Sequence, residues 1–489
     1  MSFSDQDNDF LDQTSLDEYQ ESEVLDTMFA QEPFRSYHQV DYSVKTVDEL
    51  AKMQTIAINH VSSLIELNKD DTLLLLGYFK WNKEKLVESY LTSSEKTLHE
   101  AGISLSKTNI ENDTSICDIC FDQDSVSHKM SIACGHLFCQ TCYAYYVNEK
   151  IKSSLSPFVA CPQDGCQLFV RETVLKSLLN SAMKIRYQHL LTQKFVDNNP
   201  FLKWCPAPEC EFAIECHVSS RNLDFIVPTV RCRCGYLVCF GCGLEGHQPT
   251  LCALVKKWLL KCKEDTETAK WISDNTKECG QCFATIEKNG GCNHMTCKKC
   301  QYQFCWLCLK NWSSHQNSYQ CNRFAGEQNK VHSESKSSIE RYLHYFTRYT
   351  NHEESAKLQR VLYAKTEKIM VQMQQTNDLS WIEVQFLKRA VDIAFESRST
   401  LKWTYAFAFY LQKSNETTLF EDNQRDLEMA TEQLSELLEN PLQKSDIASL
   451  RQNVLDKSVY VTQRQQTLLS DTAKGLQEGR WLFNVDIYS

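Results

Sequence analysis

The sequence predicts a mostly α-helical, multidomain protein with small zinc-stabilised α/β modules in its middle. Two observations lead to this fold class. All 24 cysteines fall between Cys117 and Cys321, and the cysteine-free flanks carry apolar residues at helical spacing. A chain of 489 residues is also long enough for several domains. We therefore expect an array of zinc modules flanked by helical domains.

The first 40 residues are acidic and polar, with no Lys or Arg before Arg35. Such a composition buries little apolar surface, so residues 1–40 are predicted to form a disordered tail, with a docking segment as the alternative. The same residues do not resemble a signal peptide. We therefore expect a reducing compartment, the cytoplasm, with the nucleus left open as a second location.

Both flanks of the cysteine-rich region predict helices. Residues 44–100 contain the segment VDELAKMQTIAINHVSSLIELNKDDTLLLLGYFKWNKEKLVESYL, whose apolar spacing predicts three short helices. In residues 325–489, segments such as DLEMATEQLSELLEN place Leu427, Leu434, Leu437 and Leu438 on one face and predict a helical bundle. The longest apolar run there, WTYAFAFYL, is about half of the ~20 residues that a membrane-spanning helix needs, so we expect no span.

The cysteines are predicted to bind zinc, because paired thiols in a reducing compartment act as metal ligands rather than disulfides. Structural zinc takes four Cys or His ligands, so the test is whether the ligands sort into fours. They form three successive groups of eight, which predicts six zinc ions and folding that depends on them. The groups are Cys117, Cys120, Cys134, His136, Cys139, Cys142, Cys161 and Cys166; Cys205, Cys210, Cys232, Cys234, Cys239, Cys242, His247 and Cys252; and Cys279, Cys282, Cys297, Cys300, Cys305, Cys308, His315 and Cys321.

Three cysteines remain outside these groups, namely Cys216, Cys262 and Cys292. The first lies in an alternating segment and the second in a helix-like connector, and both are interpreted as ordinary small apolar residues. Cys292 differs because Gly290 and Gly291 precede it in NGGCNHMTC and allow an exposed turn.

Cys292 is therefore predicted to be a nucleophile, since thiolates attack thioesters readily. The alternative is a spare zinc ligand that displaces Cys297, which would break the spacing of the CKKC pair. His294 is predicted to act as a general base toward an attacking amine, and the alternative is a loop histidine without a role.

The three clusters together resemble those of a RING-between-RING ubiquitin ligase. The first has the spacing of a RING finger, and in the third TIEKNGGCNHMTC precedes FCWLC as in the family's catalytic second RING. The flanks are similar to a ubiquitin-associated-like module and to the Ariadne domain. The resemblance implies these domains: ubiquitin-associated-like, 44–100; first RING, 117–166; in-between-RING, 185–252; helical linker, 253–278; second RING, 279–321; and Ariadne, 325–489.

Membership would imply a ubiquitin-protein transferase. The first RING recruits a ubiquitin-loaded conjugating enzyme, ubiquitin moves to Cys292 as a thioester, and a substrate lysine then receives it. Ile119 matches the apolar position that contacts the conjugating enzyme, whereas Gln167 stands where ordinary RING fingers often carry a cation. The RING resemblance also implies two interleaved zinc sites, one of Cys117, Cys120, Cys139 and Cys142 and the other of Cys134, His136, Cys161 and Cys166.

The resemblance further implies autoinhibition, because the family's Ariadne domain folds over the second RING and masks the cysteine. Glu432 matches one of the masking contacts, but Leu358 and Gln359 replace a Phe-Glu pair, which predicts a weaker latch. Gln303 stands where the family commonly has a Glu that orients the histidine; it can position His294 but cannot raise its basicity. Neddylated cullin-RING complexes are the activators that the family suggests.

Two other functions compete with this interpretation. A zinc scaffold could recruit the conjugating enzyme without covalent chemistry, which would make Cys292 dispensable, and Gln303 is the one feature that favours it. A zinc array could instead bind nucleic acid, but the net charge of −11 and the shortness of basic runs such as VKKW argue against this.

Overall fold

The chain divides into two compact units. One unit contains residues 40–219 and 229–246, and the other contains residues 220–228 and 247–489 together with the residues before Val40. The computed structural model describes residues 36–104, 117, 119–121, 129–132, 134–264, 276–288, 291–317, 321–324, 334–377, 380–381, 383–439 and 447–487. The predicted acidic tail lies outside the described residues except for its last five positions.

The first of these units contains four helices near its start, and the first three begin at residues whose side chains cap them. They are α2 (Val47–Ile65), α3 (Lys69–Tyr78), α4 (Lys83–Thr92) and α5 (Ser94–Glu100). Thr46 and Glu49 form a capping box at α2, and Asn68 and Asn82 cap α3 and α4 through their side chains. The three predicted helices are thus present, and α5 extends the module by a fourth.

The first cysteine cluster follows in the same unit. Its elements are β2 (Lys129–Met130), β3 (Phe138–Cys139), α6 (Gln140–Ser153), α7 (Glu172–Leu178) and α8 (Ser181–Asn198). The predicted domain boundary at residue 185 falls inside α8, because this helix packs into the apolar core that α2 to α6 also line. Gln54 of α2 donates a hydrogen bond to the carbonyl of Leu191 of α8 (3.1 Å).

The ubiquitin-associated-like helices and the first cluster therefore share one core. Asp71 of α3 is fully buried and forms two hydrogen bonds with the guanidinium of Arg171, at 2.7 and 2.9 Å. Gly77 lies so close to the ring of Phe158 that a Cβ atom would overlap it. A larger residue at position 77 would push the helix away from the zinc module.

The second cysteine cluster contains two small antiparallel sheets. One has the order β1-β5-β4, formed by β1 (Tyr42–Lys45), β4 (Leu202–Trp204) and β5 (Ala213–Cys216); the other pairs β6 (Thr229–Arg231) with β7 (Leu237–Cys239). Strand β1 was not predicted, because four residues far from their partner carry no local signal. Cys216 is fully buried in β5, as its interpretation as a small core residue requires.

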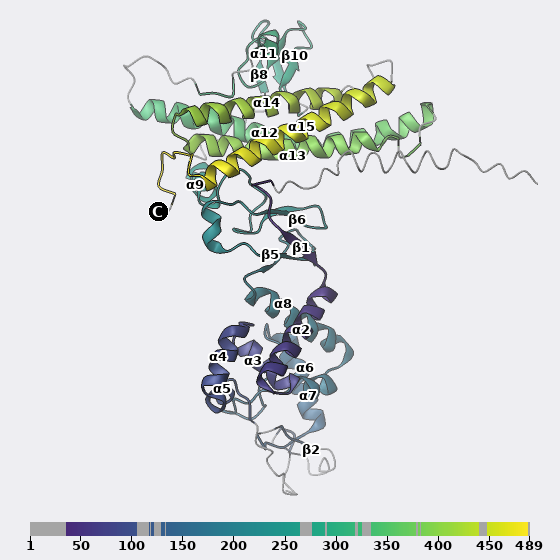
Figure 1. Ribbon diagram of the computed structural model, residues 1–489. Coiled ribbons are helices and arrows are strands. Elements are labelled where there is room, and N and C mark those ends of the chain that lie inside the picture. Colours follow the sequence, from purple (N-terminus) through teal and green to yellow (C-terminus); the bar gives the residue numbers. More distant parts are fainter. Residues whose placement is uncertain are drawn as a thin grey trace, which may run out of the picture. The chain divides into compact units, whose positions relative to one another are not determined.

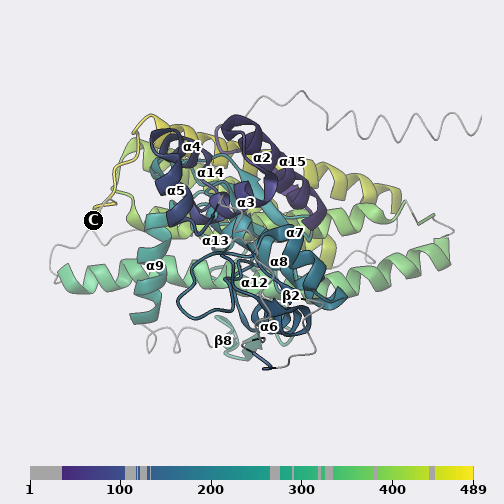
Figure 2. The same cartoon turned by 90° about the horizontal axis from the view of Figure 1, so that it is seen from below.

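Four long helices dominate the other unit and lie alongside one another (Figures 1 and 2). They are α12 (Glu334–Asn377), α13 (Gln385–Tyr410), α14 (Asn415–Glu439) and α15 (Ile447–Gln477). The predicted helical bundle is therefore present. Leu427, Leu434 and Leu438 of α14 are buried in it and Leu437 is half-buried.

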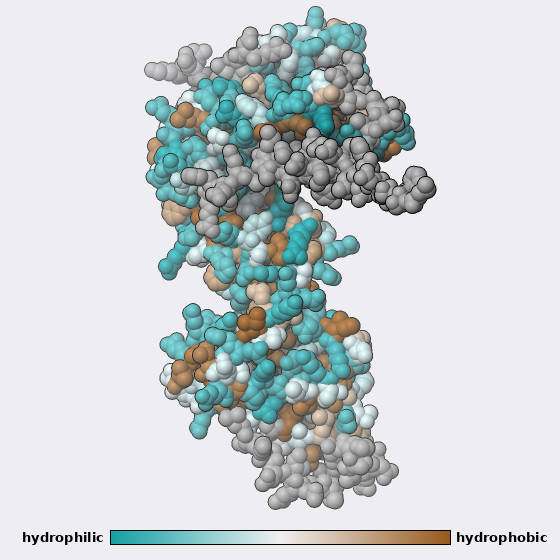
Figure 3. Space-filling view, turned by 45° about the vertical axis from the view of Figure 1, so that its right-hand side comes forward, coloured by the Kyte–Doolittle hydropathy of each residue, from teal (hydrophilic) through white to brown (hydrophobic). Residues whose placement is uncertain are grey.

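The same unit holds η2 (Ser220–Asp224), α9 (Cys252–Glu264) and the third cysteine cluster. That cluster pairs β8 (Thr276–Glu278) with β9 (Thr285–Glu287) and β10 (His294–Thr296) with β11 (Gln303–Cys305), followed by α11 (Ser313–Asn317). Among its described residues, the predicted linker at 253–278 is helical in α9, and its last three residues form strand β8. On the face shown in Figure 3, hydrophobic residues are interspersed with hydrophilic ones, so the apolar surface is broken into small areas.

Candidate functional site

The predicted zinc ligands come together in groups of four. In the first cluster they separate into the two interleaved sets that the RING resemblance implied, Cys117, Cys120, Cys139 and Cys142, and Cys134, His136, Cys161 and Cys166. The second and third clusters give Cys205, Cys210, Cys232 and Cys234; Cys239, Cys242, His247 and Cys252; and Cys279, Cys282, Cys297 and Cys300. Within each set the ligand atoms lie within 4.8 Å of one another.

The four remaining predicted ligands also converge. The His315 ring nitrogen Nε2 lies 3.2 Å from the sulfur of Cys308, and Cys308 is in hydrogen-bonding contact with Cys305 and Cys321. All 24 predicted ligands thus fall into six groups of four.

The distances between ligand atoms fit tetrahedral zinc. A Zn–S bond of about 2.3 Å gives an S···S edge of about 3.8 Å, whereas a disulfide would bring the sulfurs to about 2 Å. The sulfurs of Cys120 and Cys139 lie 3.8 Å apart, those of Cys205 and Cys234 3.7 Å, and those of Cys282 and Cys297 3.6 Å.

Histidine ligands need a second hydrogen bond to fix which nitrogen faces the metal. His247 is fully buried; its Nδ1 lies 2.7 Å from the carbonyl oxygen of Thr250, and its Nε2 lies 3.7 Å from the sulfur of Cys252. The ring therefore donates through Nδ1 and presents Nε2 to the ligand set. This is the arrangement that structural zinc requires.

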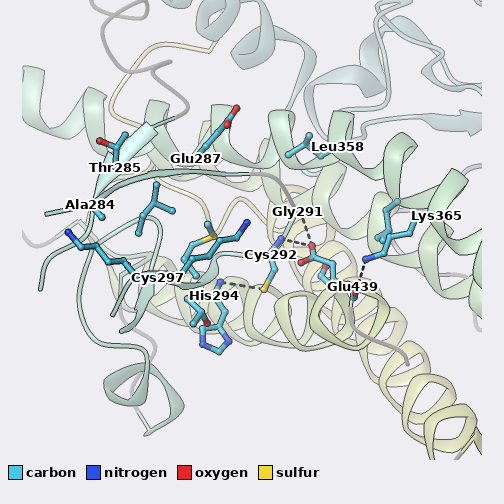
Figure 4. A pocket seen from close by; sticks show the side chains of 17 residues that line it. Ala284, Thr285, Glu287, Gly291, Cys292, His294, Cys297, Leu358, Lys365 and Glu439 are labelled. Atoms are coloured by element: carbon cyan, nitrogen blue, oxygen red, sulfur yellow. Dashed lines mark hydrogen bonds between the residues drawn. The ribbon is translucent and has the colours of Figure 1, made fainter. Parts of the chain in front are cut away.

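Cys292 lies outside all six groups. Because Cys297 is drawn into the set with Cys279, Cys282 and Cys300, a spare-ligand role for Cys292 has no place in this geometry. The sulfur of Cys292 accepts a hydrogen bond from the backbone N–H of His294 (3.3 Å), as Figure 4 shows. The same sulfur lies 3.8 Å from the carbonyl oxygen of Glu432.

The Cys292 thiol is buried, with 4 % of its residue surface exposed. This burial, reinforced by the carboxylates of Glu432 and Glu439, raises the pKa of the thiol well above its ordinary value. The glycines before Cys292 predicted an exposed turn, whereas the family resemblance predicted a cysteine masked by the Ariadne domain. The structure agrees with the second expectation, because helix α14, more than 100 residues away in the sequence, covers the loop.

Glu432 anchors α14 to this loop. Its carboxylate accepts hydrogen bonds from the backbone N–H of Asn293 (2.5 Å) and from the Asn293 side-chain amide (2.9 Å). Arg398 of α13, fully buried, donates to Glu432 (3.1 Å) and to the Ser435 hydroxyl (2.8 Å). Despite burial, Arg398, Lys288 and the Asn293 amide hold the pKa of Glu432 below its usual range.

Lys288 makes a second anchor, this time to α12. Its ammonium donates to the side-chain oxygens of Asn293 (3.0 Å), Asn351 (2.7 Å) and Ser355 (3.1 Å). Lys288 is half-buried, and its removal from solvent lowers its pKa from 10.5 to about 8. At neutral pH a lysine that is still mostly protonated thus holds the loop that bears Cys292.

Glu439, the last residue of α14, forms the third anchor. One of its carboxylate oxygens accepts hydrogen bonds from the backbone N–H groups of Gly291 (2.9 Å) and Cys292 (3.2 Å), as Figure 4 shows. Lys365 of α12 donates to the carbonyl oxygen of Glu439 (2.7 Å). The Glu439 carboxylate is therefore held directly beside the thiol.

His294 is oriented by the side chains of β11 and the segment that follows it. Its Nε2 lies 3.1 Å from the side-chain oxygen of Gln303, and its ring stacks on Trp312 with centroids 4.4 Å apart. Gln303 therefore positions the imidazole, as predicted. The other nitrogen, Nδ1, lies 3.7 Å from the carboxylate of Glu436.

A cleft of about 840 Å³ runs along this contact and is lined from both sides, by Cys292 and His294 of the third cluster and by Leu358 and Glu439 of the helices. Leu358 is half-buried there. The side chain of Gln359, predicted to weaken the latch together with Leu358, lies outside the described residues, as does Gly290.

The comparisons with known proteins match every part of this architecture. Family models match as follows: the UBA-like domain of the E3 ubiquitin-protein ligase ARIH1, residues 52–92; the C3HC4-type RING finger, 117–163; the IBR domain described as a half RING-finger domain, 185–252; a second IBR domain, 274–328; and the Ariadne domain, 340–469.

Relatives match over almost their full length. The E3 ubiquitin-protein ligase dbl4 of Schizosaccharomyces pombe is 50 % identical over 93 % of this chain and 91 % of the relative. The E3 ubiquitin-protein ligase ariadne-1 of Drosophila melanogaster is 39 % identical over 98 % and 99 %, and the human E3 ubiquitin-protein ligase ARIH1 is 39 % identical over 91 % and 82 %.

The chain belongs to the Ariadne subfamily of RING-between-RING ubiquitin ligases. It is accordingly a zinc-binding ubiquitin-protein transferase, whose partners are ubiquitin, a conjugating enzyme and protein substrates. The described residues include no helix that is both long and apolar enough to cross a membrane.

The position expected to meet the conjugating enzyme is accessible in this Ariadne-type chain. Ile119, between the two cysteines of the first knuckle, has 43 % of its surface exposed, and the neighbouring Phe121 has 75 %. Gln167, in place of the usual cation, is also exposed. Two adjacent exposed apolar residues on a rigid zinc knuckle form a surface suited to docking.

Several residues of the site were missed by sequence reasoning, among them Lys288, Asn293, Arg398 and Glu439. Lys288 and Asn293 lie within four residues of Cys292, so proximity was the signal that could have found them. Arg398 and Glu439 are ordinary charged residues in helical sequence, and their role appears only when α13 and α14 pack against the loop.

Proposed function

We propose that Cys292 accepts ubiquitin from the conjugating enzyme as a thioester and passes it to a substrate lysine. The observation that carries the proposal is the position of the thiol: it belongs to none of the six zinc sets, yet it stands on a loop bracketed by Cys282 and Cys297, two members of one set. A thiol held by a rigid frame and left out of metal binding is available for acyl transfer.

The first transfer is a thioester exchange. The Cys292 thiolate attacks the carbonyl carbon of the ubiquitin thioester, and as the new C–S bond forms the carbonyl electron pair moves onto oxygen. The tetrahedral intermediate collapses and expels the conjugating enzyme's cysteine as a thiolate. In the second transfer a lysine amine attacks the same carbon, loses a proton, and Cys292 leaves as a thiolate.

His294 is the group proposed to take that proton. Its Nε2 is engaged by the Gln303 side-chain oxygen at 3.1 Å, so Nε2 carries the hydrogen and Nδ1 is the basic nitrogen. In the closed arrangement Nδ1 faces Glu436. Release of α14 would free it for a substrate amine.

The first RING is proposed to bind the conjugating enzyme through Ile119, and the 24 cysteine and histidine ligands are proposed to hold six zinc ions. Zinc supplies structure here rather than reactivity: sets with three or four thiolates are anionic and would not ionise a neighbouring thiol. The activation of Cys292 must therefore come from opening of the site.

The Ariadne domain is proposed to hold the enzyme inactive in two ways. It covers the thiol, and its carboxylates at Glu432 and Glu439 keep the pKa of Cys292 high, so that the nucleophile stays protonated. A partner that moves α14 away from the loop would expose the Cys292 sulfur and would at the same time lower the pKa of the thiol. Leu358 in place of an aromatic residue favours a latch that opens more readily.

The domain bounds, the activating partners and the location are also proposals, and they rest on the family resemblance. The domain bounds are those given by the sequence, with 44–100 and 117–166 sharing a core. Neddylated cullin-RING complexes are proposed as activating partners, and the cytoplasm as the location. Each is supported by the kinship with Ariadne ligases rather than by a residue of this site.

The test is a trapped intermediate. The full chain carrying Cys292→Ser and Glu432→Ala is mixed with ubiquitin-loaded conjugating enzyme and analysed on a reducing gel. We expect a ubiquitin adduct that survives thiol and is cleaved by alkali, because serine forms an ester. Cys262→Ser, a matched change of a cysteine outside the zinc sets, should give none.

Two outcomes would overturn the proposal. If substrate lysines receive ubiquitin equally fast with Cys292→Ser, transfer is direct from the conjugating enzyme and the zinc-scaffold function replaces this one. If the alkali-labile adduct maps to a residue other than 292, the acceptor is elsewhere.

A further inference from the structure

Two consecutive backbone N–H groups converge on one oxygen beside the nucleophile. The N–H groups of Gly291 and Cys292 both donate to the same carboxylate oxygen of Glu439, at 2.9 and 3.2 Å. Acyl-transfer enzymes stabilise the oxyanion of their tetrahedral intermediate with such pairs, placed about 2.7–3.1 Å from the oxygen and often including the amide of the nucleophile itself.

We propose that the backbone N–H groups of Gly291 and Cys292 form the oxyanion hole of this ligase, and that Glu439 occupies it in the closed enzyme. The proposal rests on Cys292 being the ubiquitin acceptor. It assigns to the loop a catalytic role beyond carrying the thiol. In the closed enzyme a carboxylate oxygen of Glu439 thus occupies the position that the oxyanion of the reaction would take.

The carboxylate oxygen of Glu439 and the oxyanion of the tetrahedral intermediate are chemically alike. In both transfers the carbonyl electron pair moves onto oxygen when sulfur or nitrogen attacks carbon, and it returns when the leaving thiolate departs. The transient oxygen is negative, hydrogen-bonds through lone pairs and lies one bond from the carbon joined to the Cys292 sulfur. A carboxylate oxygen matches it in charge and in hydrogen-bonding capacity.

Glu439 is held by these amides together with the charges of Lys288 and Arg398, which also attract its carboxylate. It is the last residue of α14, where the helix dipole disfavours negative charge. Lys365 bonds its backbone carbonyl rather than its carboxylate. The two N–H groups therefore supply the described hydrogen-bond donors to this carboxylate, and they offset the cost of placing it beside the carbonyl end of a helix.

Glu432 provides the internal comparison. It bonds the next amide, Asn293 N–H, but it is also paired with Arg398 and with the Asn293 side chain. Those contacts fasten the loop to the helices. Among the described hydrogen bonds, the Glu439 carboxylate accepts only from the N–H groups of Gly291 and Cys292, that is, from the residue before the nucleophile and from the nucleophile itself.

The decisive experiment removes one donor without changing a side chain. Glycolic acid is incorporated at position 291 of the full chain carrying Glu439→Ala, so that an ester oxygen replaces the Gly291 N–H. Two rates are measured in single-turnover conditions: ubiquitin loading of Cys292 from the charged conjugating enzyme, and alkylation of Cys292 by iodoacetamide, followed by peptide mass spectrometry.

We expect loading to slow by about a hundredfold, the loss typical of deleting one oxyanion donor, while alkylation changes by less than about twofold. Alkylation passes through no oxyanion, so it reports only on exposure and nucleophilicity of the thiol. Glu439→Ala alone should speed loading, and Glu439→Gln, which keeps an acceptor oxygen without the charge, should lie between it and the parent.

The proposal is overturned if the ester chain loads ubiquitin at the rate of its Glu439→Ala parent. It is equally overturned if loading and alkylation fall together, since the Gly291 N–H would then only maintain the loop. Failure of the underlying acceptor role is distinguishable from both, because the Cys292→Ser chain would then form no alkali-labile ester.

Discussion

The first and third cysteine clusters begin with the same kind of zinc knuckle but differ in which of their residues are exposed. Each opens with a Cys-x-x-Cys-Phe knuckle, and Phe121 and Phe283 both adopt a φ of 55° and are 75 % and 74 % exposed. A left-handed residue after the second cysteine turns the chain around the metal. The zinc frames of the two modules are locally alike.

The difference lies in what covers them. Ile119 of the first knuckle is exposed, whereas Cys292 of the third cluster is covered by α12 to α14. The zinc sets hold both loops in place, and the helical bundle decides which of them is accessible. In this ligase the proposed docking surface is open and the proposed acceptor cysteine is covered.

Opening the third cluster should have the largest effect. Glu432→Ala leaves Arg398 buried without its carboxylate and Asn293 without two acceptors, and breaking such a buried pair costs about 3 kcal/mol or more. We expect alkylation of Cys292 and ubiquitin transfer to rise roughly a hundredfold. Peptide mass spectrometry after iodoacetamide treatment measures the first, and a discharge assay the second.

Gln433→Ala is the matched control for this change. Gln433 occupies the next position of α14 but bonds Lys457 of α15, on the far side from the loop. Its loss should leave both rates within about twofold. Equal rates in the Glu432→Ala and Gln433→Ala chains would mean that the bundle does not restrain Cys292.

The sequence predicted which cysteines and histidines come together because the spacing of the ligands is visible within short segments of the chain. Ligand spacing alone identified all 24 ligands, since two cysteines separated by a short turn can reach one metal wherever the turn lies. Helical spacing likewise located the bundle. The short strand β1 was missed because it exists only through pairing with β5, more than 160 residues later.

The closed state of the site could not be predicted in the same way. Family resemblance pointed to Glu432, but Arg398 and Glu439 make their contacts from helices far along the chain, and Lys288 is set apart only by its three hydrogen bonds in the folded site. Charged residues on an amphipathic helix normally face water. Only the packed structure shows which of them face inward.

Blocking the exposed surface should have a smaller effect. Ile119→Asp places a charge on the apolar knuckle proposed to meet the conjugating enzyme. We expect its binding to weaken at least tenfold, or about 1.4 kcal/mol, measured by titration of the full chain with the conjugating enzyme. Zinc content should be unchanged because Ile119 is not a ligand.

Ile56→Asp supplies the comparison for that measurement. Ile56 is 67 % exposed on α2 and distant in sequence from the knuckle. A general effect of added negative charge would weaken binding in both variants. If the two variants bind alike, the first cluster is not the docking surface.

The smallest effect is a pH dependence of the latch through Lys288. Its pKa is about 8 in the closed site and 10.5 when freely solvated, so between these values the closed state holds fewer protons than the open one. The closed state therefore gains stability as pH rises through this window. Lys288→Met and Lys288→Arg abolish the titration, since neither side chain changes charge there.

The measurement is the ratio of the Cys292 alkylation rate in each variant to that in the parent chain. Taking a ratio cancels the titration of the thiol and of the reagent. With these pKa values the ratio should rise roughly threefold from pH 7.5 to pH 8.5, whatever its starting value. A ratio that stays flat across this range would show that Lys288 keeps its full charge inside the closed site, and its three hydrogen bonds would then restrain the loop equally at both pH values.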